Sequence, residues 1–381
     1  MSNNQYSIRV ADMVPTLDHL YAHARRHAVM FVGPTGVGKT DVVRAWAAAH
    51  GFTEANGKLC VVHAAHIEPT DVYGIPIPDR RSGTTDFYPN AFWPWGGGIL
   101  FLDELNRAAI ATLNALLQVV LDKRVGAKRL PDDLFIVAAA NPPGGSYHVT
   151  PLSSPMVGRF AIYHVDADPD GWLAWAARRG IHPVVQTFIS RNRDALNTED
   201  DGAAQQLLPV PNPRNWERLH DALNGARYPK DLGVADRILH GIIGACVGQA
   251  MGYNFLTFWR SIDAIPEPED LFSGKAKLPK KLDHALVAGF SLVSWLQSKV
   301  VSGADAETMV TTLLQRQLDD GWDGEVVTAM TMRLASAQPG ATLTALTRAQ
   351  SKDGKTFDDQ YGDAAIQVSK ELEAAGLTNV S

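Results

Sequence analysis

Short apolar runs recur along the first 165 residues, and segments of a different pattern separate them. A strand with one solvated face alternates apolar and polar residues, whereas a continuous apolar run is typical of a strand that is buried on both faces. The runs therefore predict a parallel sheet that helices cover on both sides. They are AVMFV (28–32), KLCVVHA (58–64), GILFL (98–102), LFIVAAA (134–140) and FAIYHV (160–165).

The segments between these runs carry helical periodicity. Residues 40–51 predict a helix that closes at Gly51, because glycine readily adopts the left-handed conformation that ends many helices. A second helix is predicted from four apolar residues at helical spacing, which are Ile110, Leu113, Leu117 and Val120. We expect residues 1–165 to form an α/β nucleotide-binding core with a parallel sheet.

Beyond residue 166 the strand patterns fade and helical patterns with polar breaks replace them. A stretch rich in Pro and Lys at 265–281 precedes a further helical tail. The pattern predicts a helical region at 166–281 and a helical C-terminal region at 282–381. The clearest helical segments of the first of these regions are 170–180, 212–225 and 234–251.

The strongest local signal is GPTGVGKT at residues 33–40, here called the phosphate loop. It directly follows one apolar run and directly precedes a helical segment, which is the context that this motif requires. Its glycines let the backbone curl so that N–H groups face a phosphate chain, and the helix N-terminus adds positive charge. Lys39 is expected to reach the terminal phosphates, and the Thr40 hydroxyl is expected to bind magnesium.

Two adjacent carboxylates, Asp103 and Glu104, end the apolar run at 98–102. A buried carboxylate pair costs free energy unless a cation or hydrogen bonds satisfy it. On its own, such a pair often only caps a helix. With the phosphate loop upstream, we expect Asp103 to hold Mg²⁺ and Glu104 to act as the general base for a water that attacks ATP. The expected nucleotide-binding residues are Gly33, Pro34, Thr35, Gly36, Val37, Gly38, Lys39, Thr40 and Asp103, and the expected metal ligands are Thr40 and Asp103.

Composition narrows the range of partners. The 381 residues include 35 Lys and Arg against 41 Asp and Glu, so the net charge of −6 gives no global attraction to nucleic acid or to an anionic membrane. Cys60 and Cys246 lie far apart, which indicates a reduced compartment. No basic leader with an apolar core begins the sequence, and no apolar run reaches the roughly 18 residues of a membrane-spanning helix. We expect a cytoplasmic protein that binds no membrane.

These motifs resemble those of AAA+ ATPases, and within them the MoxR-like branch that includes CbbQ, NorQ and chelatase-type motor subunits. FLDELNRA (101–108) is similar to the DEINRA motif of that branch, and residues 71–93 are similar to its hairpin insertion, with a turn around Ser82 and Gly83. The resemblance implies that Asn141, in IVAAANPP, is the first sensor of the γ-phosphate. It also implies that Arg159, in SSPMVGRF, is an arginine finger that reaches the neighbouring subunit. Arg214, in PNPRNWERL, would be the second sensor on a helical lid.

The weaker positions each have a structural alternative. Asn141 could simply end a strand in a Pro-rich turn, and Arg159 and Arg214 could form local ion pairs or caps. Arg107 could contact a neighbouring subunit or form a local salt bridge. His63 and His66 would suggest a metal only with a third ligand. Trp93 and Trp95 are expected to pack in a cluster rather than to stack on bases.

The expected function is Mg²⁺-dependent ATP hydrolysis, with Glu104, Asn141, Arg159 and Arg214 as the catalytic residues. By resemblance, the chain would assemble as a hexameric ring that remodels or activates a protein target, often through a partner with a von Willebrand factor A domain. A nucleic-acid motor or loader on the same core is the alternative, and the acidic balance argues against it. A scaffold that binds ATP without turnover is a further alternative, against which the intact set of Lys39, Asp103, Glu104 and Asn141 argues.

Overall fold

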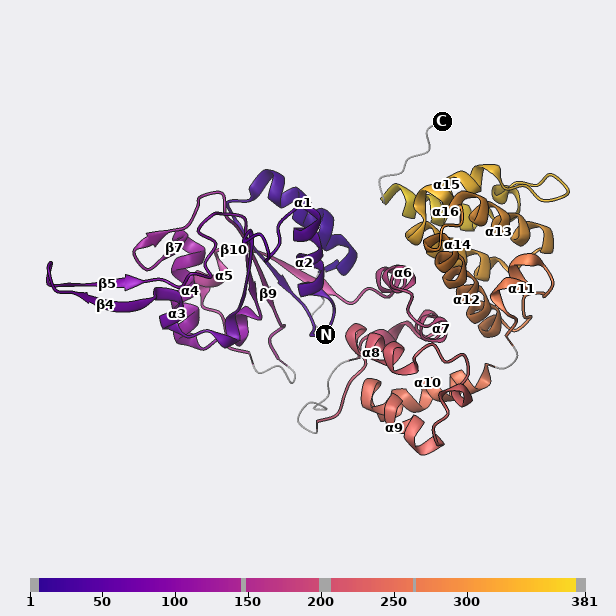
Figure 1. Cartoon of the computed structure of the whole chain (residues 1–381), viewed down its shortest axis with the longest axis horizontal. Coiled ribbons are helices and arrows are strands. Elements are labelled where there is room, and N and C mark those ends of the chain that lie inside the picture. The colour runs from indigo at the N-terminus through magenta and orange to yellow at the C-terminus, as the bar shows by residue number, and fades with distance from the viewer. Residues whose placement is uncertain (1–6, 145–148, 199–206, 263–264, 375–381) are drawn as a thin grey trace. The chain divides into compact units, whose positions relative to one another are not determined.

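The chain forms two compact units in the computed structural model (Figure 1). The model describes residues 7–144, 149–198, 207–262 and 265–374. The first unit comprises residues 1–168 and 199–208, and the second comprises residues 169–198 and 209–381.

A parallel sheet forms the centre of the first unit. Its strands lie in the order β1-β10-β2-β9-β6-β3, and each neighbouring pair is parallel. The predicted α/β core is therefore confirmed, although no sequence pattern indicated β1. The strands are β1 (Ser7–Arg9), β2 (Ala28–Val32), β3 (Leu59–His63), β6 (Ile99–Asp103), β9 (Phe135–Ala140) and β10 (Phe160–Asp166).

Alternate residues of the central strands pack on opposite faces of this sheet, as the two-residue period of a strand requires. On one face, Phe31 and Phe101 share a core with residues of α1 and α2. On the other face, Met30 and Leu102 share a core with residues of α4. The helices of this unit are α1 (Met13–Ala24), α2 (Lys39–Ala49), α3 (Pro69–Tyr73), α4 (Ile110–Asp122) and α5 (Ser154–Val157), with short 3₁₀ turns η1 (Val10–Asp12), η2 (Ala64–His66) and η3 (Leu105–Arg107).

The apolar face predicted for α4 needs a correction. Leu113 and Val120 are buried as expected, but Ile110 is 67% exposed because it begins the helix at the edge of the unit. Leu116 and Val119 are fully buried instead. The buried stripe is thus rotated by about one residue from the predicted stripe.

Two antiparallel hairpins extend from the sheet-containing unit. The predicted hairpin is confirmed as β4 (Ile75–Asp79) and β5 (Thr84–Tyr88), and Figure 1 shows it projecting from the rest of the unit. Nearly every residue of both strands is exposed. A shorter hairpin, β7 (Arg124–Val125) with β8 (Lys128–Arg129), follows α4.

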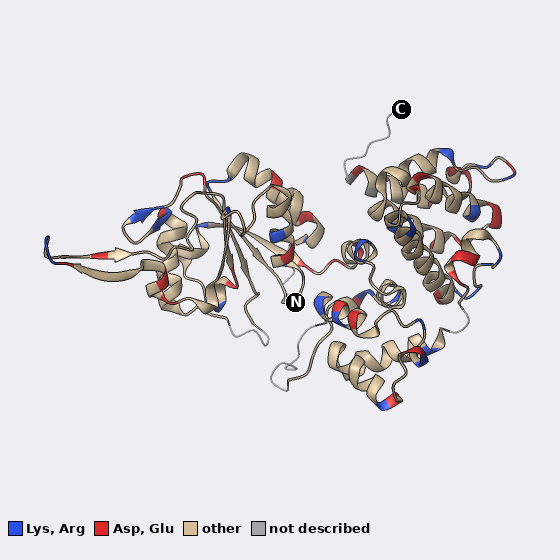
Figure 2. Ribbon diagram, viewed as in Figure 1, with Lys and Arg blue, Asp and Glu red and all other residues tan. Residues whose placement is uncertain are grey.

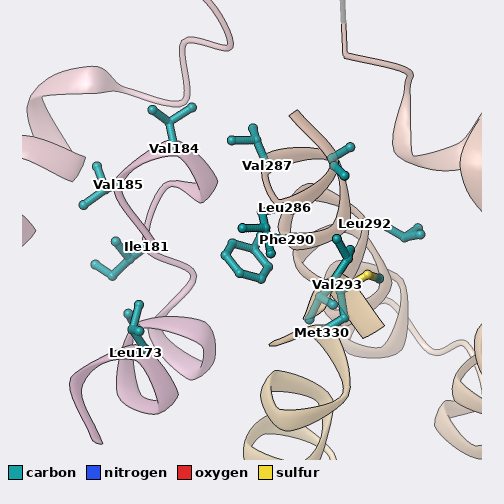
Figure 3. Packing of buried hydrophobic residues seen from close by; sticks show 14 of the residues in the cluster. Leu173, Ile181, Val184, Val185, Leu286, Val287, Phe290, Leu292, Val293 and Met330 are labelled. Atoms are coloured by element: carbon teal, nitrogen blue, oxygen red, sulfur yellow. The ribbon is translucent and has the colours of Figure 1, made fainter. Parts of the chain in front are cut away.

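The second unit is helical as far as it is described, which agrees with the fading strand signal. Figure 3 shows residues of α6 and α7 facing residues of α12 and α14 across one buried cluster. This cluster extends from Trp172 to Ala365, so helices on both sides of residue 281 contribute to it. The α-helices are α6 (Pro169–Arg179), α7 (Pro183–Arg191), α8 (Pro213–Leu223), α9 (Asp236–Val247), α10 (Gln249–Ser261), α11 (Pro268–Ser273), α12 (Leu282–Val301), α13 (Ala306–Asp320), α14 (Gly324–Ala337), α15 (Pro339–Arg348) and α16 (Phe357–Ala374), and the 3₁₀ turns are η4 (Arg193–Leu196) and η6 (Pro229–Leu232).

The boundary predicted at residues 281 and 282 stays a prediction. The helix α12 begins at Leu282, and the preceding stretch contains α11 with a fully buried Leu271. Residues 265–281 therefore pack against neighbouring helices and do not form an unpacked linker.

Neither cysteine forms a disulfide, in agreement with the sequence. The Cys60 Sγ–H donates to the Phe92 carbonyl at 3.1 Å, and burial raises the pKa of this thiol to about 12. Among the helices that the model describes, none is both long and apolar enough to cross a bilayer.

The exposure of the β4–β5 hairpin predicts that it contributes little to stability. Replacing residues 77–86 by Asn-Gly would join Pro76 to Phe87 through a two-residue turn. We expect the free energy of unfolding, measured with urea, to change by only about 0.5 kcal/mol. Changes at exposed positions usually have small effects on stability. Trp93→Ala is the control, since Trp93 is 2% exposed and its loss should cost about 3–5 kcal/mol. If the variant with the shortened hairpin were as destabilised as Trp93→Ala, the hairpin would contribute to the stability of the fold and the prediction would be wrong.

Candidate functional site

The carboxyl ends of four neighbouring strands meet at one edge of the sheet. Because β2, β9, β6 and β3 lie side by side and parallel, the residues at or just after their ends come together. These residues are Gly33, Asn141, Asp103 and His63. The sheet topology thus gathers four predicted positions that are far apart in the sequence.

The phosphate loop joins β2 to α2, as the motif predicts. Gly38 is the N-cap residue of α2 and has φ of 106°, a left-handed conformation that favours glycine. Gly33 lies against β10, where an added Cβ would stand 2.5 Å from the Val165 carbonyl oxygen. Only a residue without a side chain fits there, so Gly33 fixes how closely the loop approaches the sheet.

Lys39 is the first residue of α2 and is 8% exposed. Its Nζ donates to the carbonyl oxygens of Gly33 at 2.6 Å and Pro34 at 2.9 Å. The ammonium group therefore lies over the curl of the loop, where backbone N–H groups and the helix N-terminus also favour an anion. A phosphate bound in the loop would lie within reach of this cation.

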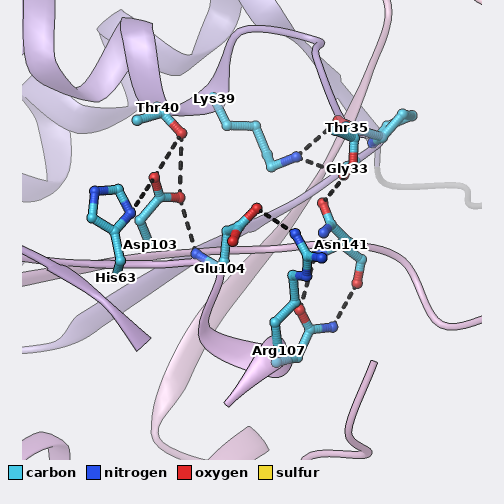
Figure 4. Close-up of polar contacts among 11 residues, drawn as sticks. Gly33, Thr35, Lys39, Thr40, His63, Asp103, Glu104, Arg107 and Asn141 are labelled. Atoms are coloured by element: carbon cyan, nitrogen blue, oxygen red, sulfur yellow. Dashed lines mark hydrogen bonds and ion pairs between the residues drawn. The ribbon is translucent and has the colours of Figure 1, made fainter. Parts of the chain in front are cut away.

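Thr40 and Asp103 lie in contact, although they come from different elements. The Thr40 hydroxyl donates to the Asp103 carboxylate, with its Oγ1 at 3.0 Å from Oδ2 and 3.2 Å from Oδ1 (Figure 4). Asp103 is 6% exposed, so this hydrogen bond helps to satisfy a buried charge. The pair offers hydroxyl and carboxylate oxygens at one point, and Mg²⁺ prefers such hard oxygen ligands.

Glu104 follows Asp103 in a left-handed conformation, with φ of 51° and ψ of 40°. This conformation costs about 1–2 kcal/mol for a residue other than glycine. Its Oε1 accepts a hydrogen bond from the Arg107 guanidinium at 2.9 Å (Figure 4). Of the two roles left open for Arg107, the local salt bridge is therefore present. Both side chains are partly exposed, so the pair adds little stability by itself.

Asn141 follows β9 and is 7% exposed. Its side-chain Oδ1 accepts a hydrogen bond of 3.4 Å from the Thr35 hydroxyl, so the amide faces the phosphate loop. This position suits a residue that senses a terminal phosphate. Pro142 and Pro143 follow it directly, as in the alternative in which Asn141 only ends its strand, and the two descriptions do not exclude each other.

Sequence reasoning overlooked Asn106, a buried amide between Glu104 and Arg107. Its side chain forms two hydrogen bonds with the main chain of Asn141, at 2.7 and 3.1 Å. The available signal was an uncharged polar residue between the acidic pair and Arg107.

The two candidate arginines from the later motifs are exposed. Arg159 lies just after α5 in the first unit, and its guanidinium makes no ion pair within the part of the chain that the model describes. Arg214 lies in α8 of the second unit. Their expected roles as finger and second sensor stay predictions.

The remaining candidates are two histidines and a tryptophan. His63 Nδ1 lies 3.7 Å from the Asp103 carboxylate, and the ring centroid of His66 is 5.7 Å from that of His63. Among residues 7–144 and the other described segments, no group of three side chains could hold a metal through His, Cys, Asp or Glu alone. Trp93 is buried and donates to the Asp71 carbonyl at 3.3 Å, so the packed interpretation of Trp93 is confirmed.

A comparison with protein families gives one match. Residues 28–160 match the family model described as "AAA domain (dynein-related subfamily)". This segment is similar to AAA domains. The match covers the strands, the phosphate loop and the acidic pair that build the site. No curated protein matches the chain.

Several solved structures are similar to the chain at low identity. A putative ATPase from Cytophaga hutchinsonii is 20% identical, with 45% of this chain and 52% of that chain covered and a TM-score of 0.33. NtrX from Brucella abortus in complex with ATP is 18% identical, with 81% and 66% covered and a TM-score of 0.35. RuvB from Thermotoga maritima is 14% identical, with 91% and 90% covered and a TM-score of 0.32. The chain thus spans about half of the Cytophaga protein.

The close approach of Gly33 to β10 predicts a defect in binding. Gly33→Ala should weaken ATP binding by about tenfold or more, because the added Cβ must push the loop away from the Val165 carbonyl oxygen. Fluorescence titration with a labelled ATP analogue measures this change. Gly96→Ala is the matched control, since nothing lies within 4 Å of its added Cβ. Equal affinities of the two variants would show that the loop tolerates displacement.

Proposed function

We propose that this chain is a subunit of a MoxR-like AAA+ ring motor that uses Mg²⁺-dependent ATP hydrolysis to remodel or activate a protein target. The observation that carries the proposal is the contact between Thr40 and the buried Asp103, with Glu104 next in the chain. A hydroxyl and a carboxylate meet beside a phosphate loop, and a second carboxylate follows immediately. This is the arrangement that nucleoside triphosphate hydrolysis needs.

The residues divide the chemistry among them. Backbone N–H groups of the phosphate loop and the Lys39 ammonium group bind the phosphates of ATP. Glu104 orients the attacking water and takes its proton, while the Asn141 amide holds the water or the γ-phosphate in line. The local ion pair with Arg107 leaves one carboxylate oxygen of Glu104, Oε2, for this task.

The donor set of Thr40 and Asp103 fits Mg²⁺, which binds few protein oxygens and keeps several waters. When bound, Mg²⁺ would neutralise charge on the β- and γ-phosphates. The two groups already lie in contact, so the chain would contribute two of the roughly six oxygen ligands of an octahedral Mg²⁺ shell.

We infer that the catalytic unit is a ring, hexameric as in the branch that the motifs resemble. Arg159 supports this, because an exposed arginine without a described ion pair is available to reach the site of a neighbouring subunit. Arg214 would read the nucleotide from the helical lid. By the same resemblance, we propose a partner with a von Willebrand factor A domain and a location in the cytoplasm.

The second candidate function, a nucleic-acid motor, receives less support from the charge distribution. Figure 2 shows Lys and Arg interspersed with Asp and Glu along the ribbon of each unit. Nucleic-acid motors need a concentrated positive surface along the phosphate backbone. Stimulation of the ATPase by DNA or RNA with a steep salt dependence would favour this alternative.

Two substitutions separate binding from chemistry. Lys39→Ala should abolish tight ATP binding, because it removes the cation that faces the phosphates. Glu104→Gln should bind ATP with unchanged affinity and stop turnover, because an amide cannot accept the proton of the water. Calorimetric titration and phosphate release measure the two effects. Turnover that persists in Glu104→Gln would remove this residue as the base.

The ring predicts complementation between two inactive variants. Arg159→Ala should bind ATP but lose about three to five orders of magnitude in rate, as arginine fingers generally do. Lys39→Ala has an empty site but keeps its finger. In a mixture, the finger of a Lys39→Ala subunit can reach the intact site of an Arg159→Ala subunit, so partial activity should return. Phosphate release that stays flat across all mixing ratios would contradict a finger supplied by the neighbour.

The β4–β5 hairpin predicts a loss of partner response without a loss of basal activity. The turn between β4 and β5 carries Arg80 and Arg81, and both side chains are exposed. Arg80→Ser with Arg81→Ser should keep basal ATPase within about twofold, because surface changes rarely disturb a distant site. A Glu104→Gln ring that cannot hydrolyse ATP should hold its protein partner longest, so it serves to capture that partner. Stimulation of the ATPase by the captured protein should fall. Lys352→Ser with Lys355→Ser, which removes the same charge from an exposed loop of the second unit, is the control. An equal loss of basal and stimulated activity would mean that the hairpin belongs to the catalytic core.

A further inference from the structure

Asn106 is a buried polar residue in the loop that carries the acidic pair. It lies in η3, two residues after Glu104, and is 6% exposed. A buried amide needs hydrogen-bond partners, since leaving its donors and acceptor unpaired is costly. Its partners therefore indicate what this residue holds in place.

The side chain of Asn106 is paired with both main-chain groups of Asn141. Its Nδ2 donates to the Asn141 carbonyl oxygen at 2.7 Å, and its Oδ1 accepts from the Asn141 N–H at 3.1 Å. The strands β6 and β9 are themselves paired up to Leu102 and Ala138. The amide of Asn106 thus acts like a further peptide group and extends the link between the two strands beyond the end of β6.

The main chain of Asn106 holds a third segment. Its carbonyl oxygen accepts a hydrogen bond from the Thr150 N–H at 2.7 Å, and the Thr150 hydroxyl donates to the Ala108 carbonyl at 2.9 Å. The chain continues from Thr150 through α5 to Arg159. One residue therefore connects the acidic loop, the candidate sensor and the start of the segment that leads to the candidate finger.

The side chain that this link orients faces the phosphate loop. Fixing both main-chain groups of Asn141 sets the direction of its Cα–Cβ bond, and the side-chain Oδ1 lies 3.4 Å from the Thr35 hydroxyl (Figure 4). The same loop sets the backbone of Glu104 in its left-handed conformation. A displacement of this loop would therefore move both the Asn141 side chain and the Glu104 carboxylate.

We propose that Asn106 is a positioning residue for ATP hydrolysis, which holds the Asn141 amide and the Glu104 carboxylate in one geometry around the attacked γ-phosphate. This inference rests on the proposed function of Asn141 and Glu104. Both hydrogen bonds of the Asn106 side chain go to the main chain of Asn141, through which it acts. Positional errors of about 1 Å can slow a reaction about a hundredfold, so loss of this link should reduce turnover far more than nucleotide binding.

The test compares three variants. Asn106→Ala removes both bonds to Asn141, and Asn106→Asp keeps an acceptor for the Asn141 N–H while losing the donor. Thr112→Val is the matched control, because Thr112 is also a buried polar residue of the same unit and donates to the Ile67 carbonyl at 3.1 Å rather than to Asn141. Thermal unfolding, steady-state ATPase kinetics and affinities for ATP and ADP are measured for each.

We expect Asn106→Ala to lower kcat by about ten- to a hundredfold with KM changed less than threefold. The preference for ATP over ADP should fall as it does in Asn141→Ala, since a misplaced sensor no longer distinguishes the γ-phosphate. Asn106→Asp should lie between the alanine variant and wild type. Thr112→Val should lose similar thermal stability while keeping kcat and nucleotide preference.

A double substitution distinguishes positioning from a general structural role. If Asn106 acts through Asn141, the variant with both residues changed to Ala should be no slower than Asn141→Ala alone. Multiplied losses, or an Asn106→Ala variant that behaves like Thr112→Val, would overturn the inference. If Asn106→Ala does not fold, the comparison of Asn106→Asp with Thr112→Val gives the same decision. Absence of phosphate release from wild type would instead contradict the proposed function.

Discussion

The buried carboxylate of Asp103 is the constraint on which the rest of this site depends. Asp103 ends a strand that is buried on both faces, and its charge lies where water is largely excluded. An unpaired carboxylate in such a place would be protonated or would destabilise the fold. The Asp103 carboxylate accepts hydrogen bonds from the Thr40 hydroxyl and from the Glu104 N–H, each at 3.0 Å, and these bonds stabilise it in part. A cation bound beside Thr40 would satisfy the remainder.

The need to stabilise the buried Asp103 carboxylate explains the arrangement of the surrounding elements. The parallel order of β2, β9, β6 and β3 brings the phosphate loop and the sensor to the same edge of the sheet as the acidic pair. The absence of a side chain at Gly33 lets the phosphate loop lie close to β10, and the left-handed backbone of Glu104 turns the chain directly after Asp103. A strained residue directly after a buried charge is expected at a functional site, because the surrounding hydrogen bonds compensate for its cost.

Much of the first unit could be predicted from its sequence, because strands buried on both faces leave an unmistakable apolar pattern. The phosphate loop was likewise predictable, since its glycines are required by local backbone geometry. The rotated stripe of α4 was not, because Ile110 and Leu117 are as apolar as Leu116 and only the position of the helix on the sheet decides which is buried. The hydrogen-bond partners of Asn106 and Arg107 depend on how the loop after β6 folds back. The spacing of apolar and polar residues carries no information about such a loop. The shared core of the second unit brings Leu173 and Phe290 into one cluster, and contacts between residues so distant in sequence have no local signal.

The most direct test of this account is metal rescue at Thr40. Sulfur is a poor ligand for Mg²⁺ and a better one for Mn²⁺ or Cd²⁺, so Thr40→Cys should change the metal preference of the ATPase. The account predicts a rate at least about tenfold lower with Mg²⁺ and a substantial recovery with the softer ions, so that the ratio of the two rates rises about tenfold over wild type. Thr112→Cys, which places a thiol elsewhere in the same unit, should keep the wild-type ratio. A Thr40→Cys enzyme with the wild-type metal preference would mean that no metal binds between Thr40 and Asp103, and the central claim would fail.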